Sequence, residues 1–229
     1  MLVHNAAQMG TVRQAEAHAG HRPQGGKAAL AGTMEMMGAA MPFSRNAEVY
    51  GENEPADYLY KVVSGAVRTY KVLADGRRQI GAFYLPGDVF GLEAGEEHTF
   101  SAEAIADSKI LVIKRSALMA LADRDNEVAR QLWAEASREL RCVQDHILLL
   151  IKTAKERVAA FLLEMAKRST NGNAVELPMS RQDIADYLGL TIETVSRMLT
   201  DLENAATIEL PTSRRVVLRN RSALARICG

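Results

Sequence analysis

Residues 181 to 200 carry a pattern that two short helices satisfy when they cross closely at a tight turn. Ala185 is a small residue where one helix would pass over the other, and Gly189 stands where the turn needs a positive φ. Ser180 and Thr191 precede the two helices and can cap them. The apolar positions that would lock the helices together are Ile184, Leu188, Leu190, Val195 and Met198. The sequence therefore predicts a helix-turn-helix.

The second helix of this pair would present a polar face at its N-terminal end, the part that enters the DNA major groove in such motifs. Arg197 can donate two hydrogen bonds to guanine, and Glu193 can accept one from cytosine. An ordinary surface ion pair between these two residues is the alternative interpretation. The candidate base contacts are Thr191, Ile192, Glu193, Ser196 and Arg197.

Residues 207–210 and 215–218 are expected to form two short strands around a Pro-Thr-Ser turn, which predicts a hairpin of the winged type. Arginines cluster around it, and we expect Arg214 and Arg215 to contact the DNA backbone. A solvated turn is the alternative. Ser180 and Arg181, at the start of the first helix, are further candidates for DNA contact.

A long helix is expected over residues 126–151, because apolar or small residues recur there in steps that alternate between four and three. The stripe consists of Ala129, Trp133, Ala136, Leu140, Val143, Ile147, Leu150 and Ala154. Such a repeat is typical of a coiled-coil seam and predicts a homodimer. The alternative is that the stripe packs on the β domain of its own chain. The predicted interface residues are Trp133, Ala136, Leu140, Val143, Ile147 and Leu150.

Between residues 43 and 114 the chain has short runs rich in Val, Ile, Tyr and Phe, separated by turn signals such as Asp75-Gly76 and Pro86-Gly87-Asp88. This spacing predicts an antiparallel β-roll. The expected class is α+β, with four segments: an N-terminal arm, disordered or partly helical, over 1–42; the β-roll over 43–122; the dimerisation helix over 123–152; and the winged helix-turn-helix over 153–229.

Charge is balanced over the chain, with 28 Lys+Arg and 28 Asp+Glu, but it is unevenly distributed. Residues 1–151 hold 16 basic and 19 acidic residues, a net charge of −3. Residues 152–229 hold the remaining 12 basic and 9 acidic residues, a net charge of +3. This modest offset permits phosphate contacts in the C-terminal part without proving them.

Other classes of protein fit the sequence less well. The apolar stretch over residues 147–151 is far too short for a membrane span, and the N-terminal residues lack the apolar segment of a signal peptide, so we expect a cytoplasmic protein. Cys142 and Cys228 are expected to be free thiols. A metal-dependent barrel enzyme is disfavoured because His98 is the only histidine of the predicted roll. We therefore expect no catalytic, metal or cofactor site.

The order of a β-roll, a long helix and a winged helix-turn-helix resembles the catabolite activator and fumarate-nitrate regulator (CRP/FNR) family over about residues 43–229. Three stretches carry the resemblance: Leu85 to Gly91, Gln144 through Leu162, and Ser180 to Leu199. The stretch Gly-Leu-Thr-Ile-Glu-Thr-Val-Ser-Arg, residues 189–197, is similar to the FixK branch. The resemblance to this branch implies that Glu193, Ser196 and Arg197 contact an inverted pair of TTGA half-sites. It also implies that RNA polymerase is a partner.

Departures from the family pattern bear on what controls the protein. The Gly-Glu and Arg-Ser or Arg-Thr pairs that hold a cyclic nucleotide are replaced by Gly91-Leu92 and by Thr99 to Ala102, so cyclic AMP binding is not expected. Residues 1–42 contain none of the cysteines that would hold an iron-sulfur cluster. Ser180 stands where some relatives carry an oxidisable cysteine.

Two hypotheses follow. The first is a dimeric regulator, mainly an activator, of genes for low-oxygen or nitrogen metabolism that binds DNA without a cofactor. The second is a sensor of the same fold whose β-roll binds a small effector.

Overall fold

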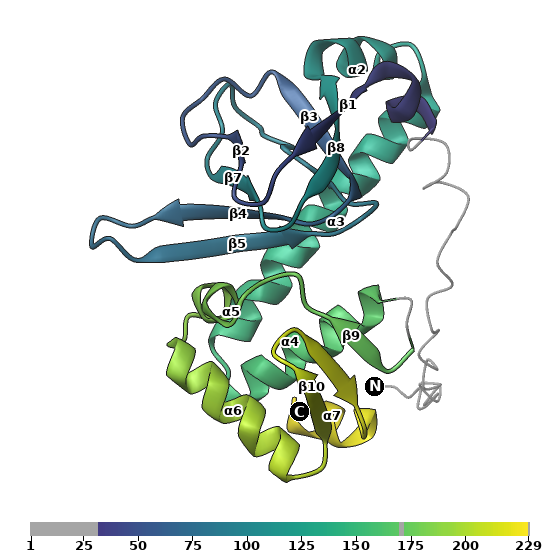
Figure 1. Cartoon of the computed structure of the whole chain (residues 1–229). Helices are drawn as coiled ribbons and strands as arrows, with labels where there is room; N and C mark the ends of the chain where they lie inside the picture. The colour runs from purple at the N-terminus through teal and green to yellow at the C-terminus, as the bar shows by residue number, and fades with distance from the viewer. Residues whose placement is uncertain (1–31, 170–171, 229) are drawn as a thin grey trace, which may run out of the picture.

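The computed structural model describes residues 32–169 and 172–228, and it places two four-stranded antiparallel sheets face to face in the N-terminal half (Figure 1). The first sheet has the order β1 (Ala39–Phe43), β8 (Ser108–Lys114), β3 (Tyr58–Ser64), β6 (Val89–Phe90). The second has the order β2 (Glu48–Tyr50), β7 (Ser101–Ala104), β4 (Val67–Val72), β5 (Arg78–Tyr84). The predicted β-roll is confirmed.

Aromatic rings fill the space between these sheets. Tyr60 stacks on Phe90 with ring centroids 5.1 Å apart, and Tyr84 stacks on the same phenyl ring at 5.0 Å. Tyr50 lies against the imidazole of His98, with 3.5 Å between the ring centroids. Large apolar rings of this kind bury much surface each, so this cluster holds the two sheets together.

The β-roll begins earlier than the expected boundary at residue 43. Strand β1 starts at Ala39 and pairs antiparallel with β8. Residues 32–37 are helical, and Met34 is completely buried beside Leu118. The sequence does not indicate this strand because it is rich in Ala and contains a proline, which weakens the β signal. Residues 1–31 of the expected arm lie outside the described residues.

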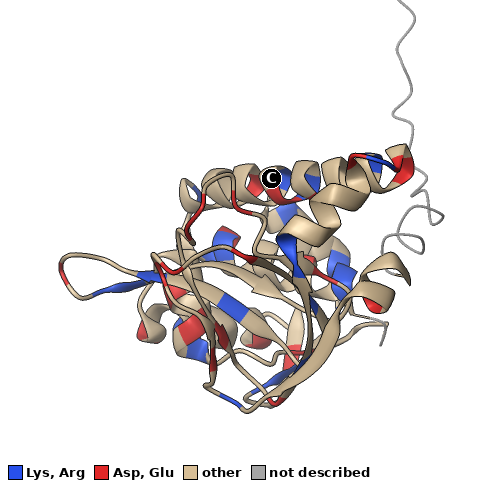
Figure 2. Cartoon of the chain, turned by 90° about the horizontal axis from the view of Figure 1, so that it is seen from above, with Lys and Arg blue, Asp and Glu red and all other residues tan. Residues whose placement is uncertain are grey.

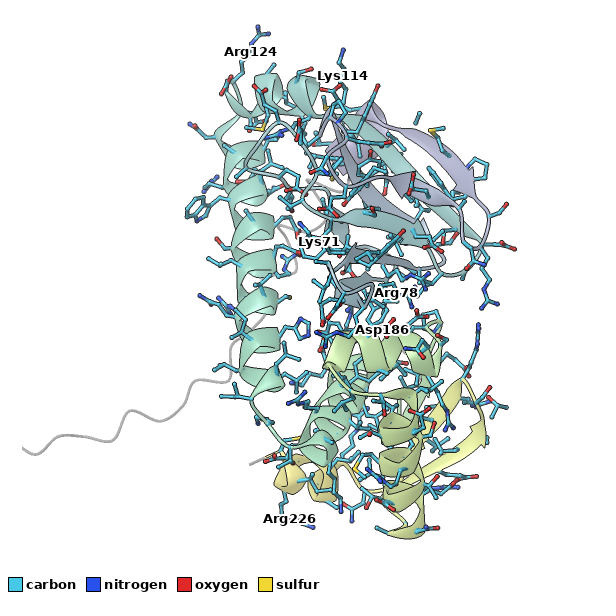
Figure 3. All side chains as sticks on the ribbon, turned by 90° about the vertical axis from the view of Figure 1, so that its left-hand side faces the viewer. Lys71, Arg78, Lys114, Arg124, Asp186 and Arg226 are labelled. Carbon is cyan, nitrogen blue, oxygen red and sulfur yellow. The ribbon has the colours of Figure 1, made fainter. Side chains whose placement is uncertain are left out.

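Two helices follow the β-roll. Helix α2 (Arg115–Ala122) was not predicted, and helix α3 (Asn126–Leu150) begins at the cap Asp125, whose side chain accepts the backbone N–H groups of Glu127 and Val128. Figure 3 shows α3 running along one side of the whole molecule, from the β-roll to the C-terminal unit. Its inward face includes Glu139, which accepts a 2.7 Å hydrogen bond from the hydroxyl of Tyr84.

The C-terminal unit combines helices with a small sheet. Its helices are α4 (Ala154–Arg168), α5 (Arg181–Leu188), α6 (Ile192–Asn204) and α7 (Arg221–Ile227). Its sheet has the order β10 (Ile208–Thr212), β11 (Arg215–Leu218), β9 (Ala174–Glu176). Thr153 and Glu156 form the capping box that starts α4. The winged helix-turn-helix is confirmed, whereas β9 and α7 were not predicted.

A single apolar core joins the β-roll to the C-terminal unit. Ile80 and Phe83 of β5 are buried in the same cluster as Phe161 of α4 and Tyr187 of α5. The Phe83 ring lies 5.2 Å from that of Tyr187, centroid to centroid. The two units are therefore held together by shared buried side chains. No helix among the described residues is long and apolar enough to cross a membrane.

Candidate nucleic-acid interface

The turn between α5 and α6 has the geometry that the sequence predicts. Gly189 adopts φ 60° and ψ 41°, the left-handed conformation that ends α5. Ala185 is completely buried where the helices cross, and its carbonyl accepts a 2.9 Å hydrogen bond from the backbone N–H of Leu190. Arg157 donates a 2.8 Å hydrogen bond to the carbonyl oxygen of Leu188 and so fixes the turn to helix α4.

We expect Gly189→Ala to lower the free energy of unfolding by about 1 to 2 kcal/mol, the cost of a left-handed conformation for a residue with a Cβ. The added Cβ would lie 3.5 Å from the Arg157 guanidinium, an ordinary contact, so the strain would come from the backbone. Urea unfolding measures the loss. Gly95→Ala is the matched control, because Gly95 has room for a Cβ and no positive φ. Equal stability of the two variants would show that the turn carries no such strain.

Both helices of the motif begin at side-chain caps. Ser180 and Asp183 form a capping box at the start of α5, in which the Ser180 hydroxyl accepts the Asp183 backbone N–H. Thr191 caps α6 by accepting the backbone N–H of Thr194. These bonds satisfy backbone donors that a helix start leaves unpaired, so the position of each helix is well defined.

Helix α6 buries one face and exposes the other. Val195, Leu199 and Leu202 are buried against the rest of the unit. The outward face carries Ile192, Glu193 and Arg197, all exposed, and Ser196, which is half-buried. The five candidate base contacts, Thr191 included, therefore lie together along the first two turns of one helix.

The two charged side chains on this outward face, Glu193 and Arg197, form no ion pair among the described residues. Within residues 32–169 and 172–228, Arg197 has no ion pair or hydrogen bond from its guanidinium, so the alternative of a Glu193–Arg197 surface pair is absent. The pKa of Glu193 is lowered because its carboxylate accepts hydrogen bonds from its own backbone N–H and from the Thr191 hydroxyl. Glu193 is thus ionised at neutral pH and can act only as an acceptor.

The other candidate DNA contacts differ in how exposed they are and in whether they form ion pairs within the chain. Ser180 and Arg181 are half-buried at the start of α5. At the wing, Arg214 is half-buried, and exposed Arg215 pairs with Glu176 of β9 at 3.4 Å. Arg219 pairs with Glu209 across the hairpin. Arg215 and Arg219 are therefore partly neutralised within the chain, whereas Arg197 is not.

The stripe predicted as a dimer seam lies on the open side of α3. Trp133 is 76% exposed, and Leu140 and Ile147 are each 59% exposed. Ala136 and Val143 are also exposed, and Leu150 is half-buried. The alternative, in which this stripe packs on the β domain of its own chain, is wrong, because that role falls to another face of α3 that contains Val128 and Leu149.

Sequence reasoning missed the residues that join the two units. Arg68 of β4 and Arg78 of β5 form ion pairs with Asp183 and Asp186 of α5. His146 of α3 donates a 2.7 Å hydrogen bond to the carbonyl oxygen of Tyr187. These contacts join residues far apart in the sequence, and no local pattern indicates them.

Basic residues do not gather at the β-roll end of the molecule. Viewed from that end, Figure 2 shows Lys and Arg interspersed with Asp and Glu over the roll. None of the described residues form a group of three or more His, Cys, Asp or Glu side chains that could hold a metal ion. Cys142 and Cys228 are both free thiols. The helix-turn-helix surface is thus the candidate functional site.

A winged helix-turn-helix joined to a β-roll by a long helix defines a class of DNA-binding regulators, and comparison with known proteins agrees. Residues 156–227 match the family model of the Crp-like helix-turn-helix domain, and residues 40–125 match that of the cyclic nucleotide-binding domain. The nitrogen fixation regulation protein FixK of Azorhizobium caulinodans is 55% identical over 83% of this chain and 79% of its own length.

Two further relatives indicate the same class of regulator. FixK of Rhizobium meliloti is 43% identical over 80% of this chain and 83% of that protein. The solved structure of FixK2 from Bradyrhizobium japonicum is 53% identical, has a TM-score of 0.82, and aligns over 84% of this chain and 98% of that one. The chain belongs to the CRP/FNR family of transcription regulators, in its FixK branch, and is not an enzyme.

Proposed function

We propose that this protein binds DNA as a homodimer, contacts an inverted pair of TTGA half-sites through α6, and mainly activates transcription together with RNA polymerase. The observation that carries the proposal is the outward face of α6, where Arg197 and Glu193 are exposed, charged and free of ion pairs among the described residues. Such side chains have to be satisfied by water or by a partner, and base edges in the major groove offer matching donors and acceptors.

Exposure of the α3 stripe supports the homodimer. A surface that exposes Trp133, Leu140 and Ile147 in regular steps is unfavourable in water and fits the seam of a second identical helix. A two-fold axis along α3 would place two copies of α6 on the same side of a duplex, which matches the symmetry of an inverted repeat.

The interior of the β-roll supports binding without a cofactor. The rings of Tyr50, Tyr60, Tyr84 and Phe90 occupy the space between the sheets. Arg115, an arginine close to the 93–97 loop, already donates to the carbonyl oxygens of Glu93 and Gly95. A cyclic nucleotide phosphate would need a cation that is not engaged in this way.

The physiological role rests on the relatives. Two of them are named as regulators of nitrogen fixation, and a third is the transcriptional activator protein Anr of Pseudomonas protegens, 36% identical over 72% of this chain and 71% of its own length. We place the targets of this protein among genes for nitrogen metabolism and low-oxygen respiration, and its action in the cytoplasm, where the chromosome lies.

One observation favours an effector-gated sensor as the second candidate. His98 is only 1% exposed, its Nε2 atom has no hydrogen-bond partner in the described part of the chain, and its Nδ1 atom lies 3.5 Å from the Glu93 carboxylate. Burial lowers the pKa of this imidazole. A buried, unpaired ring nitrogen is costly, and a small polar ligand would satisfy it.

Equilibrium titration of the purified, effector-free protein against an inverted TTGA duplex separates the two candidates. We expect specific binding with no addition, because the core between the units already fixes α6. Specific binding that appears only after small molecules from a cell extract are added would support the effector-gated sensor instead. A duplex with both half-sites scrambled, titrated at the same salt concentration, measures the non-specific background.

A further inference from the structure

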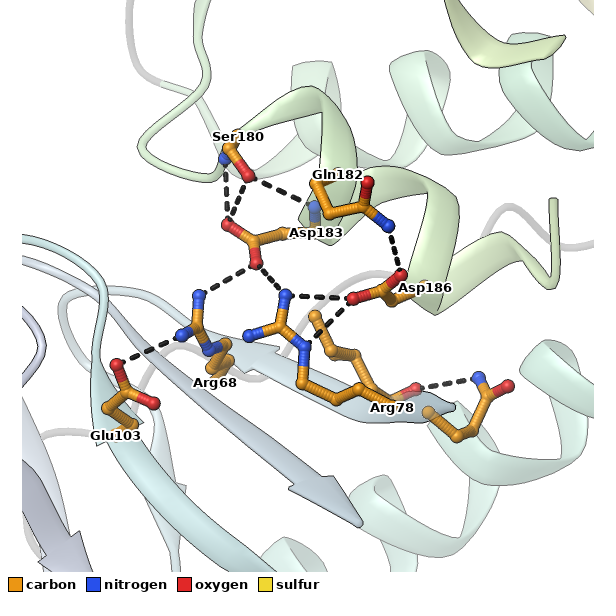
Figure 4. A network of polar contacts seen from close by, with 9 residues as sticks. Arg68, Arg78, Glu103, Ser180, Gln182, Asp183 and Asp186 are labelled. Carbon is orange, nitrogen blue, oxygen red and sulfur yellow. Dashed lines mark hydrogen bonds and ion pairs between the residues drawn. The ribbon is translucent and has the colours of Figure 1, made fainter. Parts of the chain in front are cut away.

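A network of charges, buried at Arg68 and Asp183 and half-buried at Arg78 and Asp186, joins the β-roll to the first helix of the DNA-binding motif. Figure 3 shows Arg78 and Asp186 next to each other between the two units, and Figure 4 shows the network from close by. The Arg78 side chain reaches from β5 to two carboxylates of α5, with its Nη2 atom 2.7 Å from Asp183 and 2.8 Å from Asp186. Arg68 of β4 donates to the same Asp183 oxygen at 2.7 Å.

The acidic side of this network belongs to the helix-turn-helix itself. Asp183 uses its two oxygens separately: Oδ1 accepts both arginines, while Oδ2 accepts the backbone N–H and the hydroxyl of Ser180 in the capping box. The residue that completes the capping box of α5 is therefore the same residue that binds the β-roll. A shift of the β4–β5 strands would be transmitted directly to the start of this helix.

The basic side is held in place by its own surroundings. The guanidinium carbons of Arg68 and Arg78 both lie 5.9 Å from the ring centroid of Tyr70. Arg68 also donates a 2.9 Å hydrogen bond to Glu103 of the neighbouring strand β7. The side chain of Asp183 is 5% exposed and that of Arg68 is 10% exposed. Water therefore screens the Arg68–Asp183 pair little, and its geometry is restrictive.

We propose that this network, Arg68 and Arg78 with Asp183 and Asp186, is a latch that sets the orientation of α5 and α6 on the β-roll and thereby the half-site spacing that the dimer prefers. The inference rests on the proposed function. Each recognition helix would be placed by its own β-roll, and the β-rolls are fixed to each other through α3. A small rotation at the latch would therefore change the separation of the two recognition helices.

Spacing preference distinguishes a positioning role from a role in stability alone. One added base pair moves a half-site by about 3.4 Å and rotates it by about 35°. A variant that is merely less stable would lose affinity equally at every spacing, because only the folded fraction changes. A variant with a loosened latch would lose discrimination between spacings, because its recognition helices can adapt.

The test uses the full-length protein and duplexes in which the spacer between two TTGA half-sites varies one base pair at a time. Wild-type protein should bind its best spacing about tenfold more tightly than either neighbouring spacing, because the DNA has to be twisted to fit. Arg78→Gln and Asp186→Asn should each reduce this ratio to about twofold. The double variant should resemble the single ones, because both changes break the same contact.

Arg77→Gln is the matched control. It removes the same charge from the neighbouring residue, whose guanidinium is 77% exposed and pairs with Asp75 at the tip of the hairpin. Its spacing ratio should equal that of wild type. A wild-type ratio in Arg78→Gln and Asp186→Asn, or effects of the two changes that multiply in the double variant, would overturn the latch. Wild-type protein that ignores the TTGA half-sites altogether would instead overturn the proposed function.

Discussion

Arg197→Ala is expected to weaken binding to the inverted TTGA site by about 1 to 3 kcal/mol at each half-site, the contribution of a bidentate arginine to discrimination between bases. The guanidinium is exposed on α6 and makes no intramolecular pair within the described residues. Its loss should therefore leave the thermal midpoint and the dimer unchanged. Competition between the inverted site and scrambled DNA at fixed salt measures the loss of specificity.

Arg215→Ala serves as the control for this prediction. Arg215 is exposed on the wing and pairs with Glu176, so we expect a contact with the DNA backbone at most. Its removal should weaken binding to all sequences alike and reduce the salt dependence of binding by about one counterion per protomer. If Arg197→Ala kept the wild-type ratio of specific to non-specific affinity, α6 would not contact bases through this residue.

The double substitution Leu140→Glu with Ile147→Glu is expected to convert the protein to monomers. Both side chains are 59% exposed in the single chain, so the protomer should still fold. In the dimer each change would bury an unpaired charge along the seam, at a cost of about 3 to 5 kcal/mol per unpaired group. Affinity for the inverted site should then fall toward the non-specific range, with a Kd of about 10⁻⁴ to 10⁻⁶ M.

Sedimentation measures the mass of this variant directly. Ala134→Glu is the matched control, because Ala134 is exposed on α3 but lies outside the stripe. It should remain dimeric. A double variant that sediments as a dimer would contradict the assignment of the interface to α3, even if its DNA binding were impaired.

The helix-turn-helix could be predicted from sequence because the determinants of the turn are local. Gly189 at the positive φ, Ala185 at the crossing and the caps Ser180 and Thr191 all lie within a dozen residues of one another. The long helix could also be predicted, since a regular repeat of apolar residues can be recognised without knowing the rest of the fold. Its exposure in the single chain could not be inferred, because periodicity does not say what covers a stripe.

Elements that depend on distant partners were missed. Strand β7, with the sequence Ser-Ala-Glu-Ala, lacks β-branched residues and is a strand because β2 and β4 flank it. Helix α7 is short and is stabilised by burial of Leu224. The pairs between Arg78 and α5 join residues more than a hundred positions apart, and no local pattern identifies such pairs.

Fold and site together give a simple account of action. The helix caps and the left-handed Gly189 define the angle between α5 and α6. The apolar core shared by the two units and the ion pairs beside it fix both helices to the β-roll. Pairing of two α3 helices would then place two preformed recognition surfaces on one duplex. We therefore expect the effector-free protein to bind its site specifically, since its recognition helices are already oriented in the single chain.

The most direct test of this account is the affinity of effector-free protein for three duplexes at one salt concentration: an inverted TTGA pair, the same duplex with one half-site scrambled, and one with both scrambled. We predict that the complete site binds at least about 10³-fold more tightly than the fully scrambled duplex, and that losing one half-site removes most of this advantage. Equal affinity for all three duplexes would contradict the account.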